Sequence, residues 1–204
     1  MSQVPTTAPA GVAVVADGWW SLADAAGYFP EDLPDDWRPV YFANDYQGVY
    51  VPYADWQRMP MDALAHWHRD VHEGFSFYLE WPALEWPALE WPASAAPEQL
   101  AAAVAGLGHK LAACVRWGAD TDTPGELWCP PRDSRAMCRI GQALRCPSTA
   151  QRDLRAAARW LQAVAGAAPT TLVVLSKPTS SQLADWQQLP ALLGLAVPAI
   201  VAPV

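Results

Sequence analysis

The chain has 204 residues, of which 52% are hydrophobic and 17% are charged. A chain of this length and composition can bury a full hydrophobic core, which excludes an intrinsically disordered protein and a small domain held together by disulfides. Its 13 basic and 21 acidic residues give a formal net charge of -8, so no general electrostatic attraction draws the protein to nucleic acid or to anionic lipid.

The first ten residues differ in composition from the rest of the chain. Residues 1–10 are rich in Pro, Thr and Ala, and we expect them to form a flexible leader before a single α/β domain at residues 11–204. The leader lacks the basic start and continuous apolar segment of a secretory signal. No apolar run reaches the roughly 20 residues that a membrane span needs, so we predict a cytoplasmic protein.

Short β-branched segments alternate with segments of helical periodicity along the chain. The predicted strands are residues 11–16, 48–53, 75–79, 111–117, 126–129 and 170–175, and the predicted helices are residues 35–42, 61–73, 97–108, 134–144, 153–165 and 181–193. Such alternation is typical of a parallel sheet covered by helices. Because a full eightfold barrel takes about 250 residues, we predict a small or incomplete TIM-barrel-like (βα) repeat with a mainly parallel sheet.

Residues 80–93 repeat the pentapeptide Glu-Trp-Pro-Ala-Leu. A period of five matches neither a helix nor a strand, and the proline in each unit blocks both. In one interpretation the insertion is a lid or docking arm that presents Trp81, Trp86 and Trp91. In the other, which we favour, it is a duplicated loop without function.

The last segment, residues 192–204, has no charged side chain. We favour packing of this tail on its own domain over a contact between subunits. If the protein has a protein partner or associates with itself, the candidate surfaces are the arm (80–93) and the tail (192–204). Most of the 12 tryptophans are expected in the core.

Four short motifs within residues 11–82 carry a family resemblance. They are Gly18-Trp19 with Ser21, Tyr28-Phe29-Pro30 with Leu33-Pro34, Tyr41-Phe42-Ala43 with Tyr46 and Val49, and Phe75 and Phe77 with Pro82. In order and rough spacing they resemble motifs of the YecE-like family, a group of bacterial proteins of uncharacterised function with a TIM-barrel-like fold. The resemblance implies a barrel in this chain as well.

The chain departs from that family at its polar strand positions. Tyr50 and Pro52 stand where the family's second strand has an acidic residue and an asparagine, and Glu80 stands where its third strand has a lysine. No catalytic role is therefore transferred, and the resemblance implies a divergent, non-catalytic relative.

Ligands bind at the carboxyl ends of the strands in parallel sheets, so the residues at those ends are the candidate site. Asp17 and Glu80 form the candidate catalytic pair, since two carboxylates in different environments can act as general acid and base. The alternative, which we favour, is that they cap loops or pair with Arg116. The candidate ligand-binding residues are Trp19, Tyr53, Asp55, Trp81, Arg116, Trp117 and Lys177.

These residues are suited to a small polar metabolite. Arg116 or Lys177 would hold an anionic group, and a tryptophan would stack on a ring. No cofactor is predicted, because the chain has no phosphate-cradling glycine loop and no G-x-S-x-G elbow.

The sequence has two weak candidates for a metal site, and we predict none. His68 and His72 are four residues apart beside Glu73, a spacing that can hold zinc on a helix. The H-E-x-x-H order and a clear third ligand are missing, so a solvated helix face is favoured. The four cysteines, Cys114, Cys129, Cys138 and Cys146, contain no C-x-x-C pair, so we expect buried or incidental thiols.

These residues and patterns support two functions. The first is a non-catalytic binding or protein-interaction module derived from a TIM-barrel-like family. The second is a small-molecule hydrolase or isomerase that uses Asp17 and Glu80, with Arg116 as an anchor. The second function requires these three side chains to lie within about 10 Å of one another.

Overall fold

The computed structural model describes residues 11–81, 98–118, 123–130 and 137–196. The strands are β1 (Gly11–Asp17), β2 (Gly48–Val51), β3 (Ser76–Glu80), β4 (Leu111–Arg116), β5 (Gly125–Trp128), β6 (Arg139–Arg145) and β7 (Thr170–Leu175). The helices are α1 (Ala25–Tyr28), α2 (Arg38–Asp45), α3 (Tyr53–Trp56), α4 (Met61–Asp70), α5 (Glu98–Leu107), α6 (Ser148–Arg152), α7 (Leu154–Val164) and α8 (Ser180–Leu192). Short 3-10 turns are η1 (Trp19–Ser21), η2 (Asp35–Trp37) and η5 (Gly108–Lys110).

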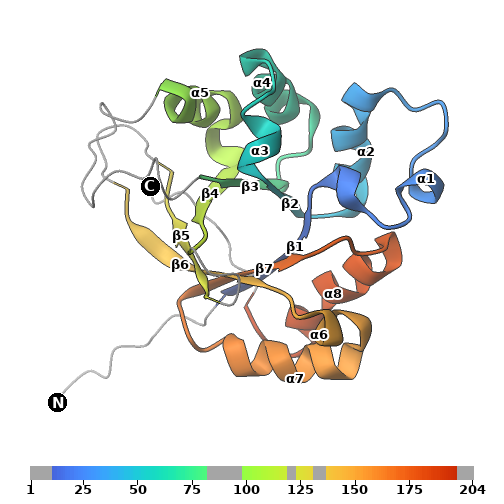
Figure 1. The fold of residues 1–204 in the computed structure, drawn as a ribbon, viewed down its shortest axis with the longest axis vertical. Coiled ribbons are helices and arrows are strands. Elements are labelled where there is room, and N and C mark those ends of the chain that lie inside the picture. Colours follow the sequence, from blue (N-terminus) through green and yellow to red (C-terminus); the bar gives the residue numbers. More distant parts are fainter. Residues whose placement is uncertain (1–10, 82–97, 119–122, 131–136, 197–204) are drawn as a thin grey trace.

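In the described residues, seven strands close into one barrel in chain order, with β7 paired to β1 (Figure 1). Strand β5 runs antiparallel to both β4 and β6, whereas the other neighbouring strands are parallel. The prediction of a small or incomplete TIM-barrel-like repeat with a mainly parallel sheet is therefore wrong. The molecule is a closed, mixed β-barrel with surrounding helices.

The error comes from residues 134–144, for which the sequence pattern predicts a helix. Residues 139–145 form strand β6, which pairs with β7 on one side and with β5 on the other. Helix-favouring Ala, Arg and Leu residues in this segment are outweighed by pairing to two neighbours. Gly141 permits the close approach to β7, because a Cβ atom at this position would overlap the carbonyl oxygen of Thr170.

Two hydrophobic cores lie on the two faces of the barrel wall. The barrel core receives at least one side chain from each strand; it consists of Val15, Tyr50, Tyr78, Ala112, Ala113, Val115, Leu127, Ala143, Leu172 and Val174. The outer core lies between the strands and the helices and holds most of the large buried aromatic side chains, among them Trp19, Trp56, Trp67, Trp81 and Trp186. This alternation follows from the period of two in a β-strand.

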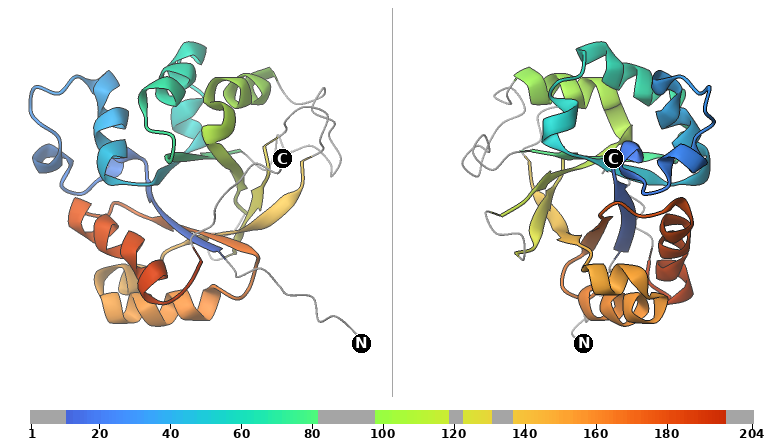
Figure 2. Two further views of the ribbon diagram at one scale, coloured as in Figure 1. Left: turned by 180° about the vertical axis from the view of Figure 1, so that it is seen from behind. Right: turned by 45° about the vertical axis from the view of Figure 1, so that its right-hand side comes forward.

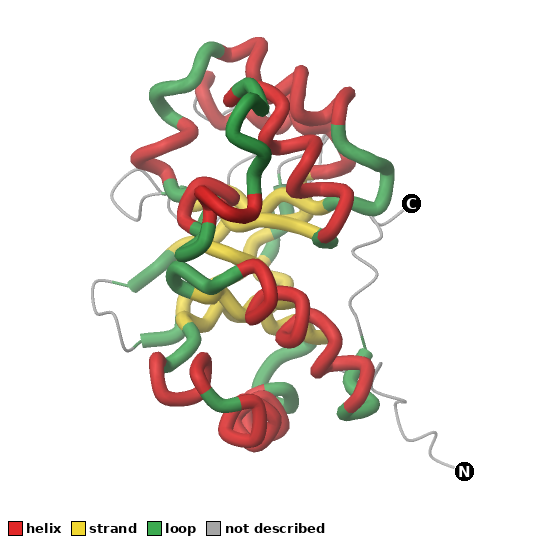
Figure 3. Tube along the Cα trace, turned by 90° about the vertical axis from the view of Figure 1, so that its right-hand side faces the viewer, coloured by secondary structure: helices red, strands yellow, loops and turns green. Residues whose placement is uncertain are grey.

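The helices cover two sides of the barrel. Helices α1 to α5 lie on one side and α6 to α8 on the other, as the views in Figures 1 and 2 show. Figure 3 shows the helices outside the strands. Among the described residues, the buried side chains of the barrel core all come from the strands, and Trp117, which follows β4, packs against them.

The described start of the tail packs on the same chain. The N–H of Val12 donates to the carbonyl of Ala196 (2.8 Å), and Leu193 and Leu195 contact the outer core, whereas Leu192 is exposed. The rest of the tail, residues 197–204, lies outside the described residues. None of the helices in the described ranges combines the length and apolar character that a membrane crossing requires.

Candidate functional site

Inward-facing polar side chains meet at the carboxyl ends of the parallel strands. Asp17 ends β1, Glu80 ends β3, Arg145 ends β6 and Trp117 follows β4. Together with Tyr50 of β2, these four residues form a set that we call the mouth cluster. Electrostatic interactions link Asp17 to Glu80 and to Arg145, so the structure brings the predicted catalytic pair together.

A chain of hydrogen bonds fixes Glu80 in the mouth cluster. The indole N–H of Trp117 donates to the Tyr50 hydroxyl (2.8 Å), and that hydroxyl is hydrogen-bonded to the Glu80 carboxylate. The backbone N–H of Tyr53 donates to Oε2 of Glu80 (3.0 Å). Burial raises the pKa of Tyr50 well above its usual range, and the negative charge of Glu80 raises it further. Tyr50 therefore stays protonated and serves as a donor.

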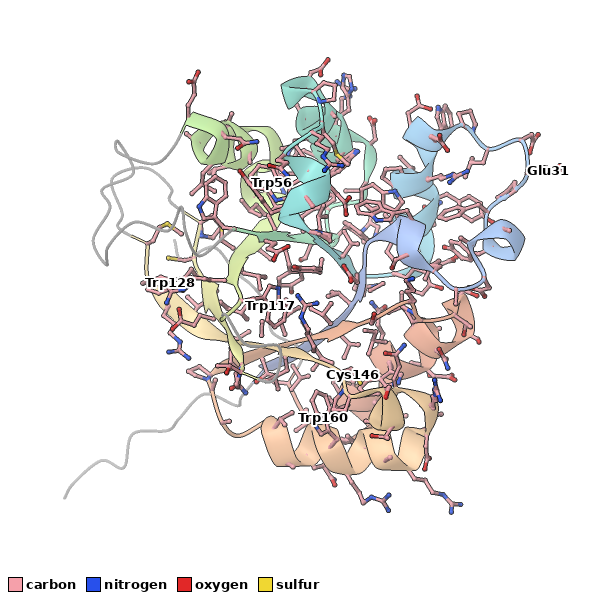
Figure 4. The ribbon with its side chains drawn as sticks, in the orientation of Figure 1. Glu31, Trp56, Trp117, Trp128, Cys146 and Trp160 are labelled. Carbon is pink, nitrogen blue, oxygen red and sulfur yellow. The ribbon has the colours of Figure 1, made fainter. Side chains whose placement is uncertain are left out.

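The Trp117 ring lies inside the barrel, as Figure 4 shows. Residue 125 on the neighbouring strand β5 is a glycine, and a Cβ atom there would stand 2.6 Å from Cε3 of Trp117. The guanidinium of Arg145 lies over the same ring, 4.3 Å from its centroid. This cation–π contact orients a positive charge at the mouth.

Asp17 differs from Glu80 in its hydrogen bonding. Its Oδ1 atom is buried and, within the described part of the chain, has no hydrogen-bond partner. Burial raises the pKa of Asp17; Arg145 opposes this rise, whereas Glu80 and Asp55 add to it. Of the two carboxylates, Asp17 is the one with a buried oxygen that has no hydrogen-bond partner among the described residues.

A pocket of about 410 Å³ adjoins the mouth cluster through Arg145. We call it the side pocket; it is lined by Thr123, Pro124, Leu144, Arg145, Cys146, Pro147, Trp160 and Val164. Figure 4 labels Cys146 and Trp160 on the side of α6 and α7. The volume lies within the range of small-molecule sites, and the lining combines one cation with mainly apolar walls.

Two further predicted residues are close enough to Asp17 to influence its ionisation. Asp55 lies on α3 and raises the pKa of Asp17, whereas Lys177 follows β7 and lowers it. Lys177 is exposed and has a backbone φ of 45°. Asp17, Glu80, Trp117, Asp55 and Lys177 are thus the predicted residues that gather at the mouth.

Arg116 lies elsewhere. Neighbouring side chains point to opposite faces of a strand, so Arg116 points away from the barrel interior that Trp117 enters. The guanidinium of Arg116 forms an ion pair with Glu126 of β5 (2.5 Å) and a cation–π contact with Trp128 (5.8 Å). Arg145 occupies the place at the mouth that the strand-end rule predicts for Arg116.

Trp19, Trp81 and the Tyr53 ring also lie away from the mouth, in or against the outer core. Trp19 contacts Trp67 with ring centroids 4.7 Å apart. Trp81 packs against Trp56 and Tyr53. Trp81 is thus a buried side chain at the start of the arm, while residues 82–93 of the arm lie outside the described residues.

Sequence reasoning missed Tyr50 and Arg145. Tyr50 belongs to a predicted strand, and its inward position could have been derived from alternation with Val49 and Val51, which face the outer core. Arg145 could not be placed at the mouth, because the pattern of residues 134–144 predicts a helix. A prediction of residues 139–145 as a strand would have placed Arg145 at a strand end and therefore at the mouth.

The histidines considered as metal ligands are used in other contacts. Helix α4 ends at Asp70, so His72 is not on a helix face with His68. Nδ1 of His68 is 2.8 Å from the carbonyl oxygen of Leu107, and Nδ1 of His72 accepts from the N–H of Gly74. Among the residues that the structure describes, no group of three or more His, Cys, Asp or Glu side chains is placed to hold a metal ion.

Comparisons with known proteins identify no relative of this chain. No protein-family model matches the chain, and no curated protein or solved structure matches it significantly. The resemblance to the YecE-like family stays a prediction.

Proposed function

We propose that the protein is a binding module for a small polar molecule, held between the mouth cluster and the side pocket. The observation that carries this proposal is Oδ1 of Asp17, which is buried without a hydrogen-bond partner in the described part of the chain. A buried acceptor without a donor costs free energy. A bound molecule with an N–H or O–H group would remove that cost.

The surrounding charges suggest the class of ligand. Arg145 belongs to both the mouth cluster and the side pocket, and a guanidinium holds carboxylate or phosphate groups well. Leu144 and Trp160 supply apolar walls in the pocket. The proposed ligand is a small anionic metabolite that also carries a hydroxyl or amino group for Asp17.

Thermal unfolding with a panel of ligands tests this proposal. The panel comprises hydroxy acids, amino acids and sugar phosphates. A ligand at 100 times its Kd stabilises the folded state by about 2.7 kcal/mol, which raises the Tm of a domain of this size by about 5–10 °C.

The same panel is then applied to three variants. Arg145→Gln and Asp17→Ala should lose the shift, whereas Arg155→Gln, which changes an exposed arginine of α7, should keep it. A panel without any shift, or an equal shift in Arg145→Gln, would contradict the proposal.

A second function is hydrolysis or isomerisation with Asp17 as general acid and Glu80 as its charged neighbour. It is favoured by the different environments of the two carboxylates: burial raises the pKa of Asp17, while Glu80 accepts hydrogen bonds from Tyr50 and Tyr53. Such pairs can divide acid and base roles. Arg116 pairs with Glu126 outside the mouth cluster, so this second function requires Arg145 as the anchor in its place.

Turnover of chromogenic esters, glycosides and phosphate esters tests this second function. Asp17→Asn should lower kcat at least about 100-fold, and Asp36→Asn, which changes an exposed acid, should not. Turnover that survives in Asp17→Asn, or none at all with the wild type, would count against it.

A protein-interaction role for residues 80–93 and 192–204 remains a further proposal. Most of both segments lies outside the described residues. Size-exclusion chromatography with light scattering tests self-association, and a monomer at all concentrations would argue against it. We propose the cytoplasm as the location, because Cys138 and Cys146 are reduced thiols, as is usual in a reducing compartment.

A further inference from the structure

Two cysteines face each other at the end of the β5–β6 hairpin where the chain connects the two strands. Cys129 directly follows β5 and Cys138 directly precedes β6. The backbone N–H of Cys129 donates to the carbonyl of Cys138 (2.8 Å), and the N–H of Cys138 donates to Sγ of Cys129 (2.9 Å). The antiparallel pairing of β5 and β6 therefore continues to this pair and holds the two residues opposite one another.

The two sulfur atoms are close to bonding distance. Sγ of Cys129 and Sγ of Cys138 are 2.9 Å apart, and a disulfide bond is about 2.05 Å long. A movement of about 1 Å would bring them to that distance. The other two cysteines, Cys114 and Cys146, are buried.

The two thiols differ in access to solvent. Cys138 is exposed and Cys129 is partly buried. Burial, together with a hydrogen bond to Cys138, raises the pKa of Cys129 to about 11. An external reagent would therefore meet Cys138 first, and Cys129 would react second from its position beside it.

We propose that Cys129 and Cys138 are a reversible redox site that forms an intrachain disulfide by exchange with a small disulfide such as glutathione disulfide. This inference is independent of the ligand site at the mouth, because β5 runs antiparallel to β4 and places the cysteine pair at the opposite end of the barrel. The disulfide would link β5 to β6 across the segment 130–137.

The reaction proceeds in two exchange steps. Cys138 loses its proton to solvent, and its thiolate attacks one sulfur of glutathione disulfide; the sulfur–sulfur bond breaks and one glutathione thiolate leaves. Cys129 then loses its proton, and its thiolate attacks Sγ of Cys138 and expels the second glutathione thiolate. The protein dithiol is oxidised to the disulfide, the glutathione disulfide is reduced to two thiols, and the leaving thiolates take up protons.

Thiol titration and intact-mass measurement test the proposal on the folded full-length chain. After incubation with glutathione disulfide and removal of the reagent, the chain should lose two titratable thiols and the mass of two hydrogen atoms. Peptide mapping should place the bond between Cys129 and Cys138, and dithiothreitol should restore both thiols.

Single variants separate the two steps. Cys129→Ser should stop at the first step and retain one glutathione on Cys138. Cys138→Ser should react at least about tenfold more slowly than the wild type, because Cys129, the thiol that remains, is partly buried. Circular dichroism checks that both variants are folded. The proposal is overturned if the wild type keeps its thiols, if the bond joins two chains, or if it involves Cys114 or Cys146.

Discussion

Trp117 can lie inside the barrel because residue 125 has no Cβ atom. In Gly125→Ala the new Cβ atom would stand 2.6 Å from Cε3 of Trp117 and 3.0 Å from the carbonyl oxygen of Arg116. The ring or the strand must then move, and overpacking of this kind costs about 1–3 kcal/mol. We expect a lower urea midpoint and a changed tryptophan emission, since the hydrogen bond from Trp117 to Tyr50 would be strained.

A second glycine provides the matched control for this substitution. A Cβ atom at Gly166 would have nothing within 4 Å, so Gly166→Ala should change the free energy of unfolding by less than about 1 kcal/mol. Equal effects of the two substitutions would show that Gly125 is not needed to accommodate Trp117.

Asp17 should make the stability of the protein depend on pH in a defined direction. Its pKa is raised in the folded state, mainly by burial, above the value of 3.8 for an unperturbed Asp. The folded state therefore binds the proton more tightly than the unfolded state, so this contribution to stability is present below pH 3.8 and is lost as the pH rises through the folded pKa.

Asp17→Asn removes this titration. The variant should be more stable than the wild type at pH 7 and 8, and the difference between the two should shrink as the pH falls toward 3.8. Urea unfolding at a series of pH values measures it. A difference that is constant with pH, or a variant less stable at pH 8, would contradict the raised pKa.

At the scale of elements, the end of α4 depends on one buried cation. Lys110 follows α5 and is only 3% exposed. Its ammonium group donates to the carbonyl oxygens of His68 (2.5 Å) and Val71 (2.7 Å) at the end of α4. This contact satisfies carbonyls that have no partner within the helix and places a positive charge at the negative end of its dipole.

Lys110→Met keeps the apolar stem and removes the donor. We expect a loss of about 2–4 kcal/mol, because the carbonyl groups of His68 and Val71 would lose a charged donor. Arg69→Met is the control: its ion pair with Asp70 is solvent-exposed, so its loss should cost less than about 1 kcal/mol. Chemical unfolding compares the two, and equal midpoints would mean that Lys110 does not hold the end of α4.

At the scale of the whole molecule, the sequence predicts most elements but not how they close. The strands at β1, β2, β3, β4, β5 and β7 are located to within a few residues, because each is a short β-branched or aromatic run. The closed mixed barrel is missed because β6 contains helix-favouring residues and a glycine. Its strand conformation depends on β5 and β7, which lie elsewhere in the sequence.

The sequence likewise predicts part of the candidate site and misses the rest. The rule that ligands bind at the carboxyl ends of parallel strands locates Asp17, Glu80 and Trp117. It cannot decide the direction of side chains at strand ends, so it selects Arg116 over Arg145, and it includes Trp19 and Trp81 although they pack in the outer core. Burial of a tryptophan depends on the helices that cover it, which the strand-end rule does not consider.

Closure of the barrel makes the two ends of the described chain depend on each other. Strand β7 pairs with β1 over six residues, from Gly11 with Thr170 to Ala16 with Leu175, and helix α8 packs against β1. Opening this seam would expose the unpaired edges of β1 and β7 and remove the contact between β1 and α8. We therefore expect the described part of the chain to unfold as one cooperative unit, as the prediction of a single domain requires.

Leu172→Ala tests this cooperativity at the seam. Leu172 is fully buried in the barrel core, so the substitution should cost about 2–5 kcal/mol. Tryptophan emission, which samples both halves of the chain, and far-ultraviolet circular dichroism should shift to the same lower urea midpoint with an unchanged slope. Leu192→Ala, at a side chain that is 76% exposed, should leave both transitions in place. Two separated transitions in Leu172→Ala would mean that the halves fold independently and that closure of the barrel does not couple them.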